Sequence, residues 1–244
     1  MTGYLKLEIL RGLRDVRYLL LALVMPVGFY LLFTELFGMH GERAEGLPQP
    51  VELMVAMTTY GAMWAVFSAT GPRIAMERQL GWLRQLRMVP LSARSLIVSR
   101  VVGSMLVALP AMALVCLTAA LVHGVRLPAG RWLEMIGVMW LATLPLALLG
   151  IAIGYLVPGD TAFGVIMGLY FALGALGGLW MPVEILPGTM QRIAHTLPSN
   201  RLADLGWKIA AGNLPTTSSL LVVAAWTAGC GALALVAYRR TAVR

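Results

Sequence analysis

Residues 216–238 read TTSSLLVVAAWTAGCGALALVAY and contain no Asp, Glu, Lys or Arg. A helix crosses the hydrocarbon core of a bilayer with about 20 predominantly apolar residues, so this stretch is long enough to span a membrane. Five other stretches have the same length and character: residues 17–37, 51–72, 97–122, 132–157 and 162–182. We therefore predict an all-α membrane protein in which six transmembrane helices form one domain over residues 1–244.

The composition excludes an ordinary soluble protein. Apolar residues make up 59% of the 244 residues and charged residues 12%, against about 45–50% and 25% in soluble domains. Six spans would use roughly half of the chain, which leaves loops too short for a separate catalytic domain. Cys116 and Cys230 both lie inside apolar runs, where a free thiol behaves as a small apolar side chain rather than as a disulfide partner or a metal ligand.

The basic residues indicate the orientation. The chain has 19 Lys and Arg against 11 Asp and Glu, a balance that in a soluble protein would suggest nucleic acid. In membrane proteins, however, Lys and Arg gather in the cytoplasmic loops. If the amino terminus is cytoplasmic, 13 of the 19 lie in predicted inner segments and 6 in outer ones. We therefore predict that both termini face the cytoplasm, and we expect no nucleic acid partner.

Residues 3–16 differ in pattern from the spans. Charged residues alternate with apolar residues that recur at helical spacing, namely Leu5, Ile9, Leu13 and Val16. The pattern predicts an amphipathic helix in the inner membrane interface, and a solvated basic leader is the alternative. A cleaved signal peptide is disfavoured, because the apolar run that follows is too long and residues 34–38 contain no small-x-small cleavage site.

The only long loop predicted on the cytoplasmic side is residues 73–100, whose core, residues 77–90, reads ERQLGWLRQLRMVP. Leu80, Leu83 and Leu86 give a short helix one apolar edge, and the proline would end it. From these residues alone two interpretations stay open. The segment is either a helix on which another protein docks, or a basic juxtamembrane loop that touches anionic lipid headgroups.

The same segment resembles that of the permease subunits of type-2 ABC exporters. The shared pattern, Glu-Arg-x-x-Gly-x-Leu-x-x-Leu-x-x-x-Pro, falls on Glu77, Arg78, Gly81, Leu83, Leu86 and Pro90. In that family the segment is a coupling helix that docks on the ATPase subunit. The resemblance therefore implies a docking surface formed by Glu77, Arg78, Leu80, Trp82, Leu83, Arg84, Leu86 and Arg87.

The resemblance also implies the partners and the location. We expect two ABC ATPase subunits, which carry ATP and magnesium, and a second copy of this permease or a close homologue. The complex would lie in the cytoplasmic (inner) membrane of a bacterium, in contact with membrane lipids.

The sequence contains no ATP site of its own. A Walker A loop needs Gly-Lys followed by Ser or Thr, whereas Lys6 and Lys208 follow Leu5 and Trp207. We therefore expect neither a cofactor nor a metal in this chain.

An ion-driven carrier is the alternative transporter class, but it places ionisable residues near the midplane, and the predicted spans hold almost none. An intramembrane enzyme is favoured less, because no span serine lies in a Gly-x-Ser-Gly setting and the three aspartates are far apart.

Residues 183–215 follow the fifth predicted span. They contain too many prolines to cross the membrane and are too apolar for a free loop. A short re-entrant or interfacial helix around residues 189–196, on the outer side, satisfies both constraints. The segment is also similar to the one that dips back into the outer leaflet in type-2 ABC permeases.

The fifth span carries small and aromatic residues on one narrow helical face: Gly164, Gly168, Phe171, Ala175 and Gly178. Such a face lets two backbones approach closely, although a chain with 26 glycines contains such spacings by chance. The resemblance adds that spans one and five line the contact between two permease subunits. We therefore predict a subunit seam or substrate path here, together with Phe29 and Phe33 of the first span. The cargo is expected to be lipophilic, a drug, an antibiotic or a lipid, because the spans offer little polar surface.

Overall fold

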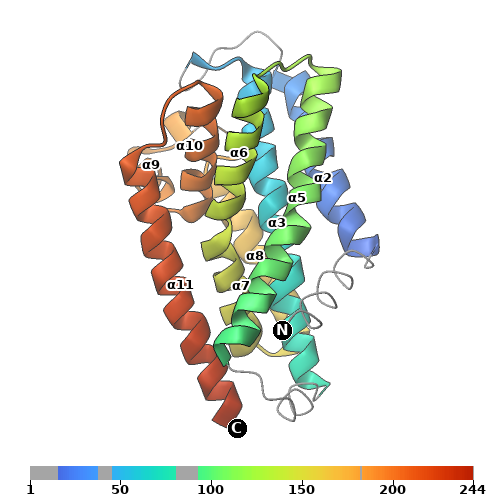
Figure 1. Cartoon of the computed structure of the whole chain (residues 1–244), viewed down its shortest axis with the longest axis vertical. Helices are drawn as coiled ribbons and strands as arrows, with labels where there is room; N and C mark the ends of the chain where they lie inside the picture. Colours follow the sequence, from blue (N-terminus) through green and yellow to red (C-terminus); the bar gives the residue numbers. More distant parts are fainter. Residues whose placement is uncertain (1–15, 38–45, 81–92, 182, 244) are drawn as a thin grey trace.

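The computed structural model describes residues 16–37, 46–80, 93–181 and 183–243. These residues form helices, with no β-strand among them (Figure 1). The elements in chain order are α2 (Val16–Phe37), α3 (Gln49–Gln79), α5 (Ala93–Val122), α6 (Ala129–Ala142), α7 (Leu144–Leu156), α8 (Gly159–Leu176), the 3₁₀ turn η2 (Val183–Ile185), α9 (Gly188–Ala194), α10 (Pro198–Ala210) and α11 (Thr217–Val243). The predicted interfacial helix lies outside the described residues except for Val16, which begins α2.

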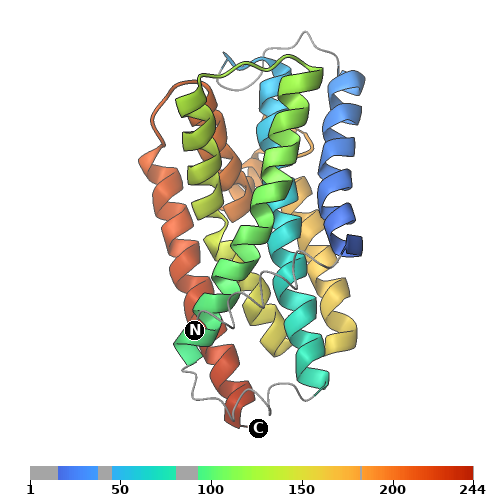
Figure 2. The same cartoon turned by 45° about the vertical axis from the view of Figure 1, so that its right-hand side comes forward.

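Five segments are long and apolar enough to cross a membrane, namely Gln49–Gln79, Leu96–Val122, Ala129–Leu156, Gly159–Leu176 and Thr217–Thr241. The apolar part of α2 whose side chains are described, Leu23–Leu36, is shorter than these five segments. The prediction of an all-α membrane protein is therefore confirmed, while the count of six spans and their orientation stay predictions. Consecutive spans run in opposite directions, so that α3, α7 and α11 all finish at the lower end of the bundle as drawn (Figures 1 and 2).

The central element is α3. It packs against α2, α5, α7 and α8, and most of its side chains are buried. Its 31 residues make a rod about 46 Å long at 1.5 Å per residue, which exceeds the roughly 30 Å of a bilayer core. The apolar stretch ends near Pro72, so the last two turns of α3 continue the same helix beyond it and carry Arg73, Glu77 and Arg78.

Glycines bring α3 and α7 into close contact. A Cβ atom added to Gly154 of α7 would lie 2.7 Å from the carbonyl oxygen of Gly71 and 2.8 Å from Cβ of Ile74, both on α3. A Cβ on Gly150, one turn earlier, would collide with the hydroxyl of Thr70. Gly150 and Gly154 thus form a small-xxx-small pair that packs α7 on α3 within the chain. From the sequence we predicted such a contact only in the fifth span.

The fourth predicted span, residues 132–157, is made of two helices that meet at Thr143. Pro145 lacks the N–H that would bond within a continuous helix, and its ring would clash with the carbonyl four residues earlier. The Thr143 hydroxyl donates to the carbonyl oxygen of Trp140 at 2.6 Å, which satisfies a group at the end of α6. The two helices together form the single candidate span Ala129–Leu156, which agrees with the predicted range and is interrupted at Thr143.

The segment after α8 contains two helices where we predicted one. The predicted helix around residues 189–196 corresponds to α9, whereas α10 was not predicted. Ser199 and Asn200, in the first turn of α10, donate to the carbonyl oxygens of Leu173 at 2.9 Å and Gly177 at 3.0 Å. These side chains cap the end of α8, and the remainder of α10 packs against α6, α3 and α11.

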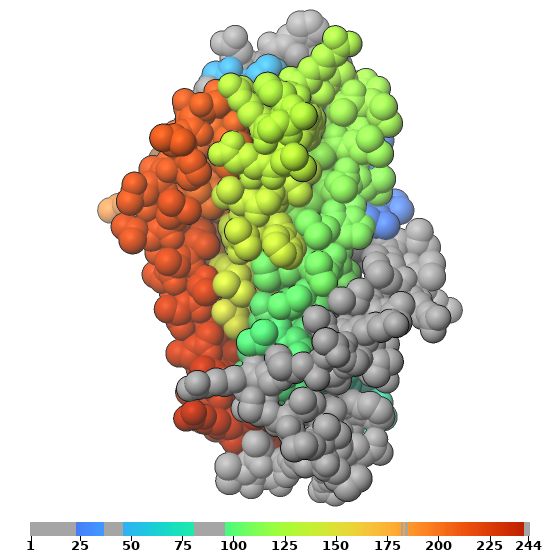
Figure 3. Space-filling view, viewed as in Figure 1, coloured from blue at the N-terminus to red at the C-terminus, as the bar shows by residue number. Residues whose placement is uncertain are grey.

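One face of the molecule shows how α11 is placed (Figure 3). There α11 forms one edge, and only a narrow strip of α7 is visible between α11 and α5. The helix packs mainly along α7 and, at its beginning, beside α10, while residues such as Leu221 and Val236 are exposed. Cys116 and Cys230 are both buried and free of disulfide bonds.

Candidate functional site

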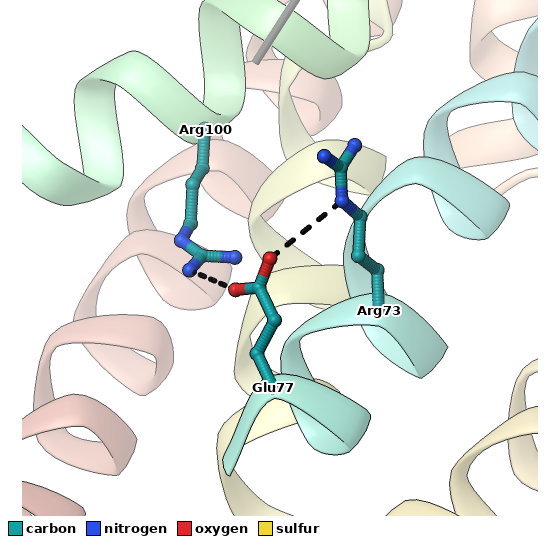
Figure 4. Close-up of polar contacts among 3 residues, drawn as sticks. All are labelled: Arg73, Glu77 and Arg100. Atoms are coloured by element: carbon teal, nitrogen blue, oxygen red, sulfur yellow. Dashed lines mark hydrogen bonds and ion pairs between the residues drawn. The ribbon is translucent and has the colours of Figure 1, made fainter. Parts of the chain in front are cut away.

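A charged cluster, composed of Arg73, Glu77 and Arg100, lies at the lower end of α3 (Figure 4). Arg100 Nη2, on α5, donates to one carboxylate oxygen of Glu77 at 2.5 Å, and the other carboxylate oxygen lies 3.7 Å from Arg73 Nε, one turn earlier on α3. The Arg100 side chain is only 2% exposed. A buried charge left without its partner costs about 3–5 kcal/mol, so the carboxylate of Glu77 holds α3 and α5 together at this end.

Arg78, the next residue, joins α3 to α7. Its Nη1 donates to the main-chain carbonyl oxygens of Gly154 at 3.0 Å and Val157 at 3.1 Å. The last turn of α7 has no following turn to supply N–H groups, and it carries the partial negative charge of a helix C-terminus, which favours a cation. The Thr241 hydroxyl of α11 donates to the Tyr155 carbonyl in the same turn, at 3.3 Å. Side chains of α3 and α11 therefore cap the end of α7.

Three of the predicted docking residues are described. Glu77 and Arg78 lie on α3 itself and bond within the chain, because α3 continues to Gln79. The first two residues of the predicted docking segment therefore belong to the helix that forms the second span. Leu80 follows directly and is 76% exposed. The other predicted docking residues lie outside the described part of the chain: Trp82, Leu83, Arg84, Leu86 and Arg87. Their role stays a prediction.

A second feature is an aromatic cluster between α2, α3 and α8, composed of Phe29, Tyr60, Trp64, Tyr170, Phe171 and Trp180. The rings of Tyr60 on α3 and Tyr170 on α8 stack with centroids 4.2 Å apart. Trp180, which follows α8, packs edge-on against Tyr60 at 5.6 Å and against Phe171 at 5.8 Å. Phe29 of α2 reaches both Tyr60 and Trp180, at 6.0 and 6.5 Å. The cluster thus links three helices that are distant in sequence.

This aromatic cluster contains polar groups without partners. The hydroxyls of Tyr60 and Tyr170 and the indole N–H groups of Trp64 and Trp180 are buried and make no well-formed hydrogen bond to a described residue, although the Tyr60 hydroxyl lies close to Tyr170 and Trp180. A buried donor without an acceptor costs about 1–3 kcal/mol. Tyr60, Trp64 and Tyr170 are buried, so the accessible ring surface of the cluster is that of Phe29, Phe171 and Trp180. Flat apolar rings next to hydrogen-bond donors suit an aromatic or otherwise apolar molecule that carries acceptors.

Phe29, Phe33 and Phe171, all predicted for the substrate path, lie at this cluster. Phe33 stacks on Phe29 at 5.6 Å, one turn later on α2. Phe171 is 37% exposed at the outer edge of α8. Tyr60, Trp64 and Trp180 were absent from the predicted set. Tyr60 and Trp64 are four residues apart, which places them on one face of a helix. This spacing is the feature of the sequence from which they could have been predicted.

The predicted seam is exposed in part. Gly164 and Gly168 lie on an open face of α8, where an added Cβ would meet nothing within 4 Å, and Ala175 is half-buried. Gly178 does not belong to this face, because α8 ends at Leu176 and Gly178 lies in the turn that follows with a φ of 76°. A Cβ there would collide with the side chain of Val183. The prediction for Gly178 was therefore wrong.

Arg73 and Arg100 were also absent from the predicted site. Arg100 is the one charged residue in the predicted span 97–122, and an ionisable residue inside a span requires a partner. That partner, Glu77, was identified from its place in a motif rather than from its charge. Within the described residues, His, Cys, Asp and Glu form no group of three or more that could hold a metal ion.

The fold and these features define a multi-pass membrane protein whose charged residues tie helix ends together. Residues 4–204 match the family model of the ABC-2 type transporter, so the chain belongs to that family, as the resemblance predicted. The chain is also 29% identical over 223 residues to YvfS of Bacillus subtilis (strain 168), whose name describes it as a transport permease; the match covers 90% of this chain and 89% of YvfS. The protein is therefore a membrane transport permease of the kind that works with an ABC ATPase.

Proposed function

We propose that this chain is the permease subunit of an ATP-driven exporter that moves a lipophilic compound out of the cell. A separate ATPase docks on the segment over residues 77–90 and supplies the energy. The observation that carries this proposal is a pair of contacts made by the first two residues of that segment. Glu77 bonds to Arg100 on α5, and Arg78 bonds to Gly154 on α7.

These contacts provide a route for motion. Residues 81–92 connect the end of α3 at Gln79 to the start of α5 at Ala93. A force applied to this connection acts on both helices, and the ion pair between Glu77 and Arg100 makes them respond together. Arg78 passes the displacement to α7, and Thr241 extends it to α11. A displacement of rigid helices of this kind is how packed bundles convert local binding into a global change.

The aromatic cluster supports a lipophilic cargo. Its rings are set between α2, α3 and α8, and Phe171 and Trp180 lie partly open at its margin. The Tyr60 hydroxyl and the Trp180 indole N–H donate to no acceptor among the described residues, so both could donate to acceptors of a bound molecule. A sugar or a metal ion would need many more polar groups than this surface offers.

The open face of α8 supports a second copy of the permease. Gly164 and Gly168 lack side chains on a face that no other described helix covers. In lipid, small residues let two backbones approach and gain close packing. We propose that two copies of the chain meet at this face, each with its own ATPase subunit.

The docking proposal is tested by charge reversal. The affinity-tagged chain is expressed from its native operon, extracted in mild detergent, and compared with the double variant Arg84→Glu/Arg87→Glu and with the matched control Arg126→Glu/Arg192→Glu. We expect the wild type and the control to purify with a protein that contains a Walker A motif and hydrolyses ATP, and the docking variant to lose it.

Equal recovery of the ATPase with both double variants would contradict docking on this segment. Reconstitution of the chain alone in vesicles gives a second check. Transport driven by an ion gradient without any ATPase would favour the ion-driven carrier instead.

A further inference from the structure

A cavity of about 770 Å³ lies at the lower end of the bundle, where α3, α7 and α11 finish. Its walls are mostly apolar, and Arg78 and Thr241, which join the ends of α3, α7 and α11, are among its lining residues. The lining residues are Arg78, Tyr155, Leu156, Ala237, Arg239, Arg240 and Thr241. No acidic residue is among these described lining residues, so three arginines share one cavity without a carboxylate from the described part of the chain.

The arginines of this cavity have guanidinium N–H groups that bond to no described residue. Arg78 uses Nη1 for the carbonyls at the end of α7, and its other guanidinium nitrogens have no hydrogen-bond partner among the described residues. Arg239 and Arg240 are exposed and form no ion pair with a described residue. Glu77, the acid nearest in sequence to Arg78, is already bonded to Arg73 and Arg100. An anion that enters the cavity would therefore meet uncompensated positive charge.

The position of the cavity along the bundle indicates which anion is available. Arg239 and Arg240 come directly after the charge-free stretch 216–238, and the rings of Tyr155 and Tyr238 pack edge-on beside them at 5.3 Å. Tyrosines and arginines at the end of a span mark the level of the lipid headgroups. Phosphate groups of anionic phospholipids occupy this level at high local concentration in the cytoplasmic leaflet.

The apolar part of the cavity fits the rest of such a lipid. Leu156 lines the cavity and is 47% exposed, and Val236 lies exposed on the neighbouring turn of α11. A free phosphate ion would gain nothing from these side chains, whereas an acyl chain would bury apolar surface along them. We propose that this cavity binds one anionic phospholipid of the cytoplasmic leaflet, with its phosphate on Arg239, Arg240 and Arg78 and an acyl chain along Leu156 and α11.

A bound lipid would have a structural effect. It would contact α3 through Arg78, α7 through Leu156 and α11 through its last two turns. Those three helix ends are the ones that Arg78 and Thr241 already join. The lipid would therefore reinforce the end of the bundle that adjoins residues 81–92. This inference depends on the predicted orientation for its choice of leaflet, and not on the ATPase or the cargo.

The test is a lipid titration followed by native mass spectrometry. The full-length chain is purified in detergent, delipidated, and titrated with dioleoyl phosphatidylglycerol, with dioleoyl phosphatidylcholine, or with inorganic phosphate. We expect one phosphatidylglycerol to bind with clear preference over phosphatidylcholine. In Arg239→Gln/Arg240→Gln the affinity for phosphatidylglycerol should fall about 30-fold, because each arginine near the surface contributes about 1 kcal/mol. The matched control is Arg126→Gln/Arg192→Gln, which removes two exposed arginines at the opposite end.

A second variant separates the two parts of the ligand. Leu156→Trp narrows the apolar wall and leaves every arginine in place, so it should weaken phosphatidylglycerol binding. An unchanged preference in the Arg239/Arg240 variant would overturn the proposal, as would an equal loss in the control. The proposal would also be overturned if millimolar inorganic phosphate displaced the lipid and the Leu156→Trp variant bound phosphatidylglycerol as tightly as the wild type. These two results would assign the site to a free anion.

Discussion

Arg78 and Gly154 are 76 positions apart in the sequence, and a hydrogen bond of 3.0 Å joins the Arg78 guanidinium to the Gly154 carbonyl oxygen. The same glycine lacks the side chain that would separate α7 from α3. Gly154 therefore allows α3 and α7 to cross closely, and its carbonyl oxygen accepts the hydrogen bond that holds the end of α7 on α3. The register of α3 on α7 is set at the point where α3 leaves its apolar stretch.

Replacement of Arg78 by glutamine should destabilise the lower end of the bundle. Glutamine is too short to reach both carbonyls of the last turn of α7, which would lose charged hydrogen bonds worth about 1.5–3 kcal/mol. Thermal unfolding of the purified chain in detergent should show a lower midpoint for Arg78→Gln. Arg126→Gln, an exposed arginine at the opposite end, is the control, and identical midpoints for the two variants would show that the capping contacts contribute nothing.

The ion pair between Glu77 and Arg100 should be strongly coupled. In Glu77→Gln the buried Arg100 side chain would lose its charged partner, a change that costs about 3–5 kcal/mol. In Glu77→Gln/Arg100→Gln that unpaired charge is gone, so the double variant should be less destabilised than the sum of the single variants. A double-mutant cycle on unfolding midpoints measures the coupling. Additive effects would contradict the pairing.

The crossing of α3 and α7 should tolerate no methyl group at Gly154. In Gly154→Ala the new Cβ would press on Gly71 and Ile74, and overpacking of this kind costs about 1–3 kcal/mol. Gly137→Ala on α6 is the matched control, because a Cβ there meets nothing within 4 Å and alanine favours a helix by about 1 kcal/mol. We expect a lower unfolding midpoint for the first variant and an equal or higher one for the second.

The aromatic cluster should affect the export of a lipophilic dye. Cells that carry the permease with its ATPase are loaded with Hoechst 33342, and dye efflux is followed by fluorescence. Tyr60→Phe and Trp180→Phe keep an aromatic ring but remove a donor, so each should slow efflux about 5-fold, the effect of one hydrogen bond of about 1 kcal/mol. Tyr238→Phe, outside the cluster, should leave efflux unchanged at equal expression. A uniform effect of all three variants would argue against binding at the cluster.

The seam on α8 should bring two copies within cross-linking distance. The native cysteines are buried, so a new cysteine on a helix surface is the accessible thiol. Gly168→Cys in native membranes should form a covalent dimer with copper phenanthroline, detected on a non-reducing gel. Gly229→Cys on α11, equally free of neighbours within 4 Å, should stay monomeric. Dimers formed equally by both variants would indicate random collisions in the membrane.

Spans were predictable because they rest on one strong signal. A run such as residues 216–238 contains no charged residue and is long enough to cross a bilayer, a combination that is not typical of soluble proteins. The five described candidate spans overlap the predicted ranges closely. The break at Thr143 was less visible, because the apolar character of residues 132–157 continues through Pro145 and does not show where one helix ends and the next begins.

The contacts of the site were harder to predict than its place. The motif located Glu77 and Arg78, but it could not reveal that they bond to Arg100, Gly154 and Val157, since those partners follow from how three helices pack. Gly178 illustrates the opposite error. Its spacing fits a helical face on paper, yet α8 ends before it and its positive φ directs the chain toward Val183. Periodicity holds only as far as the helix continues.

The junction at Thr143 divides the fourth span between two sets of neighbours. Its upper half, α6, packs chiefly on α10, whereas its lower half, α7, packs on α3 and α11. A helix interrupted at a proline bends there at lower cost than an unbroken one. The predicted fourth span thus consists of two segments with different attachments, so we expect the lower half to tilt without the upper half following it. Such a span would bend at Thr143 instead of moving as one straight rod.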